Sequence, residues 1–301
     1  MAHLPALLKE SVSGLRIRRD SLVIDATADG GGHAAEFLKK LGRRGKLILL
    51  DWDPEMISIL RKKFGSEGRV RIFHLNFQDI RKLGKSQSAG WRRPDAIFFD
   101  LGLSSLQLDA SGRGFSFQRD EPLIMRFDPL SGPTAAEYLA RANKDELAEV
   151  IWKYGEERAA RKIAEAIVRL RQKREIRTTA DLRRIIEGVL PRRGKIHPAT
   201  RTFQALRIYL NGELRNLEQG LENGFEILKP GGRMAAISFH SLEDRIIKNF
   251  FKDKARAGAA RLVTKKPLPP SAREIFENPR ARSAKLRILE KNDKKDDKNN
   301  R

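Results

Sequence analysis

Apolar and polar residues follow two different periods along the first hundred residues of the chain. Short runs rich in β-branched and aromatic residues predict strands at 22–26, 46–51, 69–75 and 95–101. Segments with helical spacing separate them, and Pro54 suits the first turn of one of these helices. Such alternation predicts a parallel, doubly wound sheet with helices on both faces.

The pattern changes in the middle of the chain. From about Gly112 to Ala199 the spacing predicts helices and no strand. Apolar residues at steps of three or four then predict one long helix from about Phe203 to Leu228. A fifth strand at 233–239 follows.

Near the carboxyl terminus the α/β pattern resumes. We expect a helix at 241–251 with Ser241 as its N-cap, and a terminal pair of strands around Leu262 and at 284–290. One α/β domain is therefore predicted to be split by a helical insertion. The α/β domain is predicted to comprise residues 1–111 and 200–290, and the insertion residues 112–199. Residues 291–301 are predicted to form a disordered basic tail of low complexity.

Composition narrows the class of protein. The 301 residues contain no cysteine, which excludes disulfides and thiolate chemistry. No apolar run is long enough to span a membrane and no signal peptide is recognised, so we expect a cytoplasmic protein without a membrane partner. The formal net charge of +22 favours RNA or DNA as partner, although a generally basic surface would give the same excess.

The stretch "VIDATADGGGHAAEF" (23–37) raises the question of a cofactor. Gly30, Gly32 and Ala35 fit the G-x-G-x-x-A pattern, and Asp51 ends the next predicted strand, where an acid binds ribose hydroxyls. The spacing allows a nicotinamide dinucleotide or S-adenosylmethionine (SAM), or a glycine-rich turn without a ligand. No P-loop lysine follows, which disfavours a nucleoside triphosphate.

Asp25, Asp51 and Asp100 each end a predicted strand, and these strands would be neighbours in a doubly wound sheet. Three acids at one sheet edge indicate a ligand site better than three separate turn caps. His33 and His240 are placed at the same edge, where capping or core roles are equally compatible with the sequence. No histidine and carboxylate spacing indicates a metal site.

Between residues 156 and 195 there are 13 Lys and Arg against 6 Asp and Glu. Solvated helix faces and an RNA-contacting surface explain this excess equally well.

Five long motifs resemble the bacterial 16S ribosomal RNA cytosine-N4 methyltransferases. The resemblance extends from about Leu22 to Glu290. The motifs are "DLGLSSLQLDASGRGFSFQRDEPLIMRFD" (100–128), "YGEERAARKIAEAI" (154–167), "HPATRTFQALRIYLN" (197–211), "SFHSLEDRIIKNFF" (238–251) and "NPRARSAKLRI" (278–288).

The resemblance implies a Rossmann-like, SAM-dependent methyltransferase sheet, with seven strands expected, and an inserted helical domain. It implies as substrate a cytidine in the decoding region of 16S rRNA in the small ribosomal subunit. It also implies SAM contacts at Gly31, Gly32, His33, Asp51, Phe77, Asp100 and Gln107.

Asp100 is our candidate catalytic residue. Cytosine N4 is a poor nucleophile, and an acceptor on its NH2 group would orient the lone pair toward the methyl group. Many amino-methyltransferases have an Asp-Pro-Pro-Tyr-type motif here, whereas this chain has Asp-Leu-Gly-Leu at 100–103. We therefore expect another aromatic residue to hold the base, with Phe115, Phe117 and Phe239 as candidates.

Cationic and aromatic side chains in these five motifs are candidate RNA contacts, although the cations could equally form salt bridges between the two predicted domains. The candidates are Arg113, Phe115, Arg201, Phe239, His240, Arg280 and Arg282.

One local departure from the family pattern precedes Gly31. The family usually has Phe-Gly-Arg where this chain has Ala28, Asp29 and Gly30, so an arginine is missing and an acid enters the loop.

Two other functions stay compatible with parts of the sequence, namely a nicotinamide dehydrogenase and a non-catalytic ribosome-assembly protein. The sequence also leaves a homodimer open.

Overall fold

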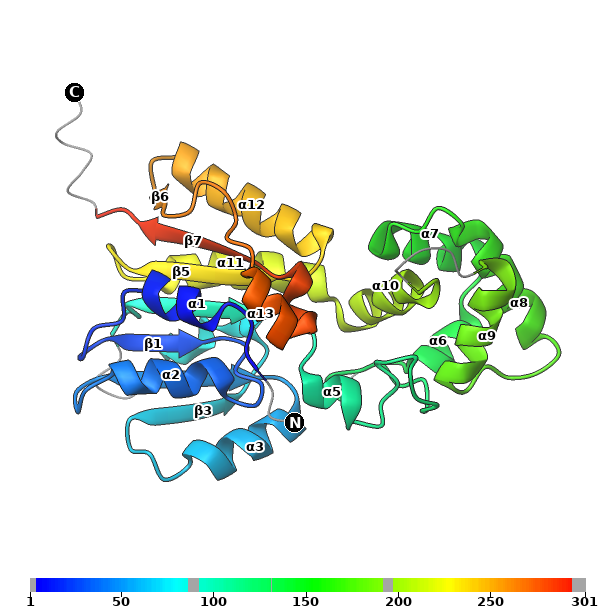
Figure 1. The fold of residues 1–301 in the computed structure, drawn as a ribbon, viewed down its shortest axis with the longest axis horizontal. Coiled ribbons are helices and arrows are strands. Elements are labelled where there is room, and N and C mark those ends of the chain that lie inside the picture. The colour runs from blue at the N-terminus through cyan, green and yellow to red at the C-terminus, as the bar shows by residue number, and fades with distance from the viewer. Residues whose placement is uncertain (1–3, 86–91, 131, 192–196, 294–301) are drawn as a thin grey trace. The chain divides into compact units, whose positions relative to one another are not determined.

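The computed structural model describes residues 4–85, 92–130, 132–191 and 197–293, and the chain divides into two compact units. Residues 1–102 and 214–301 form the first, called here the sheet unit, and residues 103–213 form the second, the helical unit (Figure 1). The helical unit begins before and ends after the predicted insertion. Its last helix belongs to it because Asn211 hydrogen-bonds to Met125 and Phe127 of the same unit.

The strands described in the sheet unit form one sheet in the order β3-β2-β1-β4-β5-β7-β6. The neighbours from β3 to β5 are parallel, whereas β7 is antiparallel to both β5 and β6. The predicted Rossmann-like α/β sheet with seven strands is confirmed, and the chain order reverses between β1 and β4. The strands are β1 (Leu22–Asp25), β2 (Lys46–Asp51), β3 (Val70–His74), β4 (Ala96–Asp100), β5 (Arg233–Ser238), β6 (Ala260–Leu262) and β7 (Lys285–Lys291).

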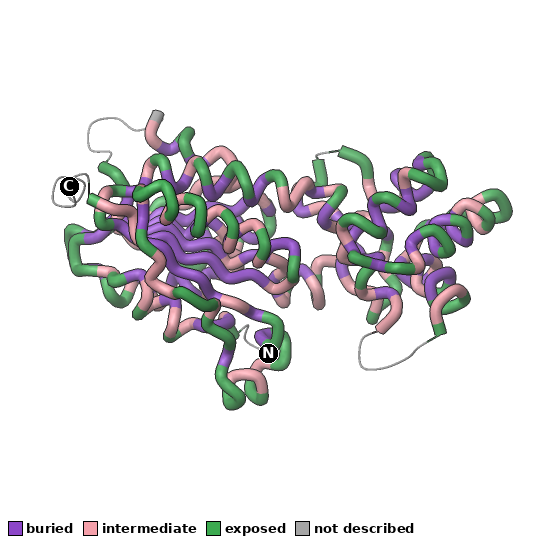
Figure 2. Tube along the Cα trace, turned by 90° about the horizontal axis from the view of Figure 1, so that it is seen from above, coloured by how far each residue is buried: buried purple, intermediate pink, exposed green. Residues whose placement is uncertain are grey.

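Helices cover both faces of this sheet because successive strand residues point to opposite sides. Phe98 packs in the core beneath α1, α2 and α3, while its neighbour Phe99 packs in the core beneath α11 and α12. Figure 2 shows the central strands of the sheet as a buried layer, and β1, β2, β4 and β5 are buried over most of their length. The helical segments here are α1 (Leu8–Gly14), α2 (Gly32–Lys40), α3 (Pro54–Phe64), η1 (Phe77–Asp79), α4 (Lys82–Lys85), α11 (Glu213–Ile227), α12 (Ser241–Arg256), α13 (Ala272–Glu277) and η2 (Pro279–Ser283).

The helical unit has its own buried apolar core, to which α7, α8 and α9 contribute Ile151, Ile163 and Ile186. Capping boxes start α6 at Thr134 and α9 at Thr178. The helices of the unit are α5 (Ser105–Asp109), α6 (Ala135–Arg141), α7 (Lys144–Gly155), α8 (Ala160–Arg171), α9 (Thr179–Val189) and α10 (Ala199–Asn211).

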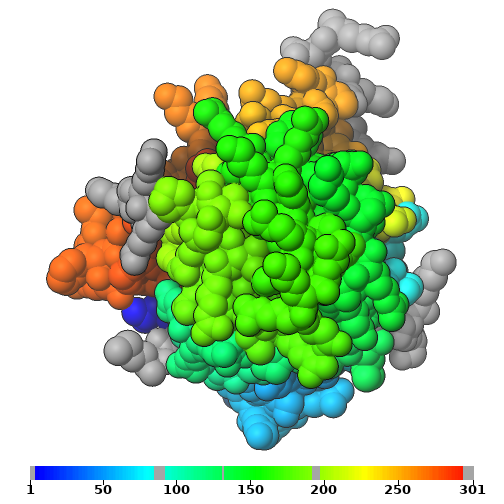
Figure 3. All heavy atoms as spheres, turned by 90° about the vertical axis from the view of Figure 1, so that its right-hand side faces the viewer, coloured from blue at the N-terminus to red at the C-terminus, as the bar shows by residue number. Residues whose placement is uncertain are grey.

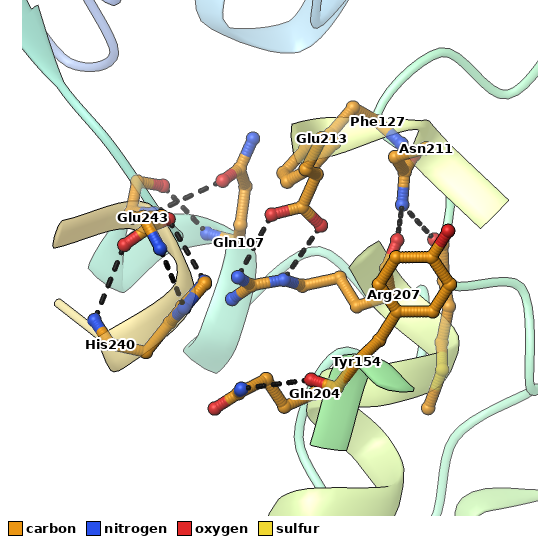
Figure 4. Close-up of polar contacts among 11 residues, drawn as sticks. Gln107, Phe127, Tyr154, Gln204, Arg207, Asn211, Glu213, His240 and Glu243 are labelled. Atoms are coloured by element: carbon orange, nitrogen blue, oxygen red, sulfur yellow. Dashed lines mark hydrogen bonds and ion pairs between the residues drawn. The ribbon is translucent and has the colours of Figure 1, made fainter. Parts of the chain in front are cut away.

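Side-chain bonds tie the end of α10 to the rest of the helical unit. Arg207 forms a two-pronged ion pair with Glu213, with N–O distances of 2.8 and 2.9 Å (Figure 4). The Asn211 side chain accepts from the Phe127 N–H at 3.0 Å and donates to the Met125 carbonyl at 2.8 Å. In the described part of the chain, no helix is both long and apolar enough to cross a membrane.

Three sequence-based expectations about element boundaries are wrong. The long helix predicted from about Phe203 is two helices, because Gly212 adopts a left-handed φ of 60° between α10 and α11. The N-cap of α12 is His240 rather than Ser241. Lys291, predicted to begin the tail, ends β7, and residues 294–301 of that tail lie outside the described residues.

Candidate active site

Three acids end the parallel strands on either side of the chain reversal. Asp25 ends β1, and its register partners are Leu49 of β2 and Phe98 of β4. Asp51 and Asp100 are the last residues of β2 and β4. All three carboxyls therefore lie at the carboxyl edge of the sheet, where ligands bind in open α/β folds.

The Asp51 carboxyl holds the glycine-rich loop in place. It accepts backbone N–H bonds from Asp29 and Asp53, both at 2.9 Å. Burial raises its pKa to about 8 although these two bonds lower it. Because hydrogen bonds donated to a carboxylate favour the ionised form, a ligand hydroxyl here and the charged state of Asp51 would stabilise each other.

The loop leaves no space for side chains at Gly31 and Gly32. Gly31 is the N-cap of α2 with φ of 72°, and a Cβ atom there would lie 2.5 Å from the Phe64 ring. A Cβ on Gly32 would lie 2.4 Å from Pro5. Asp29 also has a left-handed φ, of 46°, a conformation that glycine adopts more readily than other residues.

Lys63 of α3 clamps the same loop. Its Nζ donates to the Gly30 and Gly31 carbonyls at 3.0 and 2.9 Å. Partial burial lowers the pKa of this lysine. The clamp fixes the backbone that a ligand would approach, because both carbonyls are turned toward α3.

His33 connects the loop to the acid of β4. The ring is buried, its Nε2–H donates to the Ala6 carbonyl at 3.0 Å, and its Nδ1 lies 3.3 Å from Asp100 Oδ2. Burial alone lowers the pKa of His33, but the bond to Asp100 and the charges of Asp100 and Asp25 outweigh it and raise the pKa above its ordinary value. With both ring nitrogens facing oxygen acceptors, the geometry suits a doubly protonated ring.

Asp25 and Asp100 keep one carboxyl oxygen each without a hydrogen-bond partner among the described residues. The other Asp25 oxygen accepts from Thr27 N–H at 3.3 Å, and the Asp100 N–H donates to Thr27 Oγ1 at 2.6 Å. Burial raises the pKa of Asp25 to about 7, and the positive charge of His33 opposes this shift. Buried acceptor atoms without donors are where a ligand donor would be satisfied.

Phe77 and Gln107, the remaining predicted cofactor contacts, lie in different units. Phe77 follows β3 in η1, where its half-buried ring packs edge-on against Phe99 with centroids 5.7 Å apart. Gln107 is buried in the helical unit and forms a capping box with Ser104, accepting its N–H at 3.0 Å (Figure 4).

The predicted RNA contacts of the helical unit are mostly enclosed. Arg113 is buried and donates to the Phe127 carbonyl at 2.8 Å. Phe115 is 6% exposed and stacks on Phe127 at 5.1 Å, so it presents little surface to a base within this unit. Arg201 is exposed, with Nη1 3.8 Å from Glu157.

Phe117, a further candidate to hold the base, also packs inside the helical unit. Its ring stacks on His197 with centroids 4.6 Å apart and meets the edge of Phe203 at 5.3 Å.

The predicted RNA contacts of the sheet unit fall into two groups. Phe239 packs against Gly102, and its N–H donates to Glu243 at 2.8 Å. His240 caps α12 through a reciprocal bond with Glu243 (Figure 4). Arg280 and Arg282 lie on η2 with exposed side chains.

Sequence reasoning missed Lys63, Thr27 and the segment around Pro5 that covers Gly32. That segment is held by α13, because the Leu7 N–H donates to Glu274 at 2.6 Å. No local sequence pattern predicts a hydrogen bond between residues so far apart in the chain. It also missed Phe276 on α13, whose ring is 87% exposed.

A family of methylases matches nearly the whole chain. The model of the MraW methylase family matches residues 1–292. The Ribosomal RNA small subunit methyltransferase H of Xanthomonas euvesicatoria pv. vesicatoria (strain 85-10) is 45% identical over 96% of this chain and 89% of its own length. That of Stenotrophomonas maltophilia (strain K279a) is 45% identical over 96% and 93%. Among solved structures, an rRNA methylase from Streptococcus thermophilus aligns with a TM-score of 0.46 and 11% identity over 97% of this chain and 100% of that one.

Proposed function

The chain belongs to the MraW methylase family, and from this premise we propose that it methylates the exocyclic N4 of a cytidine in the 16S rRNA of the small ribosomal subunit. It is a SAM-dependent methyltransferase. The observation that carries the proposal is the edge formed by Asp25, Asp51 and Asp100 beside the glycine loop.

The residues at this edge fit the cofactor. Asp51 offers acceptors for ribose hydroxyls, and Phe77 leaves part of its ring exposed beyond β3. Gly31 and Gly32 lie at the start of α2, where helix N–H groups favour a carboxylate. The buried Asp100 Oδ1, which has no hydrogen-bond partner among the described residues, is an acceptor suited to a positively charged or N–H-bearing group.

SAM, when bound, supplies an electrophilic methyl group attached to a sulfonium sulfur. The role of Asp100 is to accept a hydrogen bond from the target amine and so direct the nitrogen lone pair. His33 holds the Asp100 carboxyl through its Nδ1 contact and is itself fixed by the Ala6 carbonyl. Lys63 and Asp51 keep the loop backbone in one conformation.

Exposed cations and an exposed ring beside this edge favour RNA as the substrate class. Arg280 and Arg282 of η2 follow directly after α13, which carries the exposed Phe276. α13 also holds the segment that covers the glycine loop, through Glu274. Arginines and exposed rings are the groups that bind phosphates and unstacked RNA bases. A ribosomal substrate implies a cytoplasmic location, and the homodimer stays a prediction.

Methyl transfer from labelled SAM to small subunits that lack the modification tests the proposal, with nucleoside analysis of the product. We expect label in N4-methylcytidine, and an Asp100→Asn variant should transfer at least about 100-fold more slowly because the oriented acceptor is weakened. Label absent from N4-methylcytidine would refute the proposed substrate. An Asp100→Asn variant with full activity and full SAM affinity would refute the role of Asp100.

Thermal protection separates the alternatives. SAM should raise the unfolding temperature and NAD should not, because bound ligand stabilises the folded state by mass action. A non-catalytic assembly protein would bind RNA without any transfer of label.

A further inference from the structure

A basic groove lies between α8 and α9 of the helical unit. It has a volume of about 310 Å³, and the described residues that line it include four cations and no acid. Its remaining lining is apolar or glycine. The residues of this α8–α9 groove are Ala166, Arg169, Leu170, Lys173, Arg174, Arg184, Ile185, Gly188 and Val189. Figure 3 looks onto the unit that carries both helices, drawn in green.

The groove cations come from both helices and the turn between them. Arg169 lies on α8, Lys173 lies in the turn that follows Arg171, the last residue of α8, and Arg184 lies on α9. Arg184 and Gly188 are four residues apart on α9 and therefore share a helix face. All three cationic side chains are exposed. Between them, the side chain of Ile185 is buried and forms an apolar floor.

The charge of the groove is only partly balanced within the unit. Arg174 lies 3.7 Å from Asp181, and the charge of Arg184 helps to lower the pKa of Asp120; both acids lie outside the groove lining. Gathering like charges around one groove costs free energy that an external anion recovers. Solvated helix faces, the alternative interpretation of the basic stretch at 156–195, would not require the cations to face one groove that no described acid lines.

We propose that the α8–α9 groove binds the sugar-phosphate backbone of the RNA substrate, at a distance in sequence from the methyl-transfer residues. The identification of the polyanion as RNA rests on the proposed function. A guanidinium group can donate two parallel N–H bonds to two phosphate oxygens. The cations of α8, of the turn after it and of α9 together offer several such donors to one RNA strand. The apolar floor suits the sugar edges of that strand.

Gly188 provides a sharp test because it lies in the groove and is exposed. A Cβ atom there would meet nothing within 4 Å, so a side chain can be added without a clash. Gly188→Glu places a negative charge among the cations, Gly188→Lys a positive one, and Gly188→Ala is the matched neutral control. A second variant, Arg169→Gln/Arg184→Gln, removes two cations without adding an acid.

The experiment measures binding of the full-length chain to a fluorescein-labelled RNA of the decoding region by anisotropy, over a range of salt concentrations. Relative to Gly188→Ala, we expect Gly188→Glu to bind about 10-fold more weakly and Gly188→Lys at least as tightly. The double variant should lower the slope of log K against log salt by about 1 to 2, the loss of one or two phosphate contacts. SAM binding by calorimetry should be equal in all variants, which shows that the sheet unit is intact.

Equal RNA affinity and equal salt slope in Gly188→Glu and Gly188→Ala would overturn the proposal. So would a change seen only with anionic phospholipid vesicles and not with RNA. Weakened RNA binding by Gly188→Glu in a protein that makes no N4-methylcytidine would support the groove and refute only the proposed function. If the wild-type protein makes N4-methylcytidine and no groove variant changes RNA binding, only the proposed role of the groove is refuted.

Discussion

The contacts of His33 with Ala6 and Asp100 make the stability of the fold depend on pH in a way that a single substitution can test. In His33→Gln, a neutral amide replaces a ring that contacts Ala6 at 3.0 Å and Asp100 at 3.3 Å. A charge-assisted hydrogen bond contributes about 1.5–3 kcal/mol and a neutral one about 0.5–1.5 kcal/mol. The ring contact with Phe98, with centroids 4.5 Å apart, adds about 0.5–1.5 kcal/mol. Because the Gln amide can keep one neutral hydrogen bond, the lost charge-assisted bond and ring contact together predict a loss of about 2–4.5 kcal/mol in the free energy of unfolding at pH 6.

The sign of the pH dependence follows from the raised pKa of His33. Its unfolded value is 6.5 and its folded value is higher, so the stabilisation is complete below pH 6.5 and is lost as the pH rises through the folded value. The difference between wild type and His33→Gln should accordingly be smaller at pH 9 than at pH 6, because less of the ring is charged at the higher pH. Asp25 titrates in the same region, with a pKa raised to about 7, so the comparison is repeated in an Asp25→Asn background.

Urea unfolding at pH 6 and pH 9, followed by circular dichroism, measures these free energies. His74→Gln is the matched control, since His74 also bonds a backbone carbonyl, that of Trp52 at 2.9 Å, but is exposed. Its effect should be small and equal at both pH values. A His33→Gln effect that is the same at pH 6 and pH 9, or larger at pH 9, would refute the assignment of a protonated His33 beside Asp100.

Three further predictions concern the glycine loop and the helical unit. Gly31→Ala should weaken SAM binding at least about 10-fold by calorimetry, because the residue has a positive φ and no space for a Cβ, whereas Gly68→Ala, with open space, should bind normally. Lys63→Gln should lower SAM affinity about 10-fold with an unchanged circular dichroism spectrum, since it removes two hydrogen bonds to loop carbonyls. Lys62→Gln, at the neighbouring exposed lysine, is the control and should leave the affinity unchanged. Equal SAM affinities of the two variants would exclude a role of Lys63 in holding the loop. Gly188→Ala should raise the free energy of unfolding by about 0.5–1 kcal/mol in urea titrations, and a decrease would show that its Cβ does not point into open space.

Most of the sheet could be predicted because its signals are local. Strand composition, helical spacing and Pro54 in the first turn of α3 each depend on a few neighbouring residues. The acids of the site could be predicted for the same reason. Once β1, β2 and β4 are parallel neighbours, their last residues Asp25, Asp51 and Asp100 must share one edge of the sheet.

The errors arose where local signals are ambiguous. Apolar steps of three or four continue through Gly212, so the spacing could not show that this residue would turn left-handed and divide the helix. Ser241 and His240 are both able to cap α12, and the choice depends on the reciprocal bond between His240 and Glu243.

The sequence by itself therefore determined the strands, the order of the motifs, the glycine turn and the acids at the strand ends, since each is encoded by spacing along the chain. Only the tertiary structure decided which groups support them. The pairing of His33 with Asp100, the clamp from Lys63 to the loop and the burial of Phe115 against Phe127 all join residues from separate elements. Such contacts form when independent elements pack together, and their geometry depends on the whole core rather than on any local pattern.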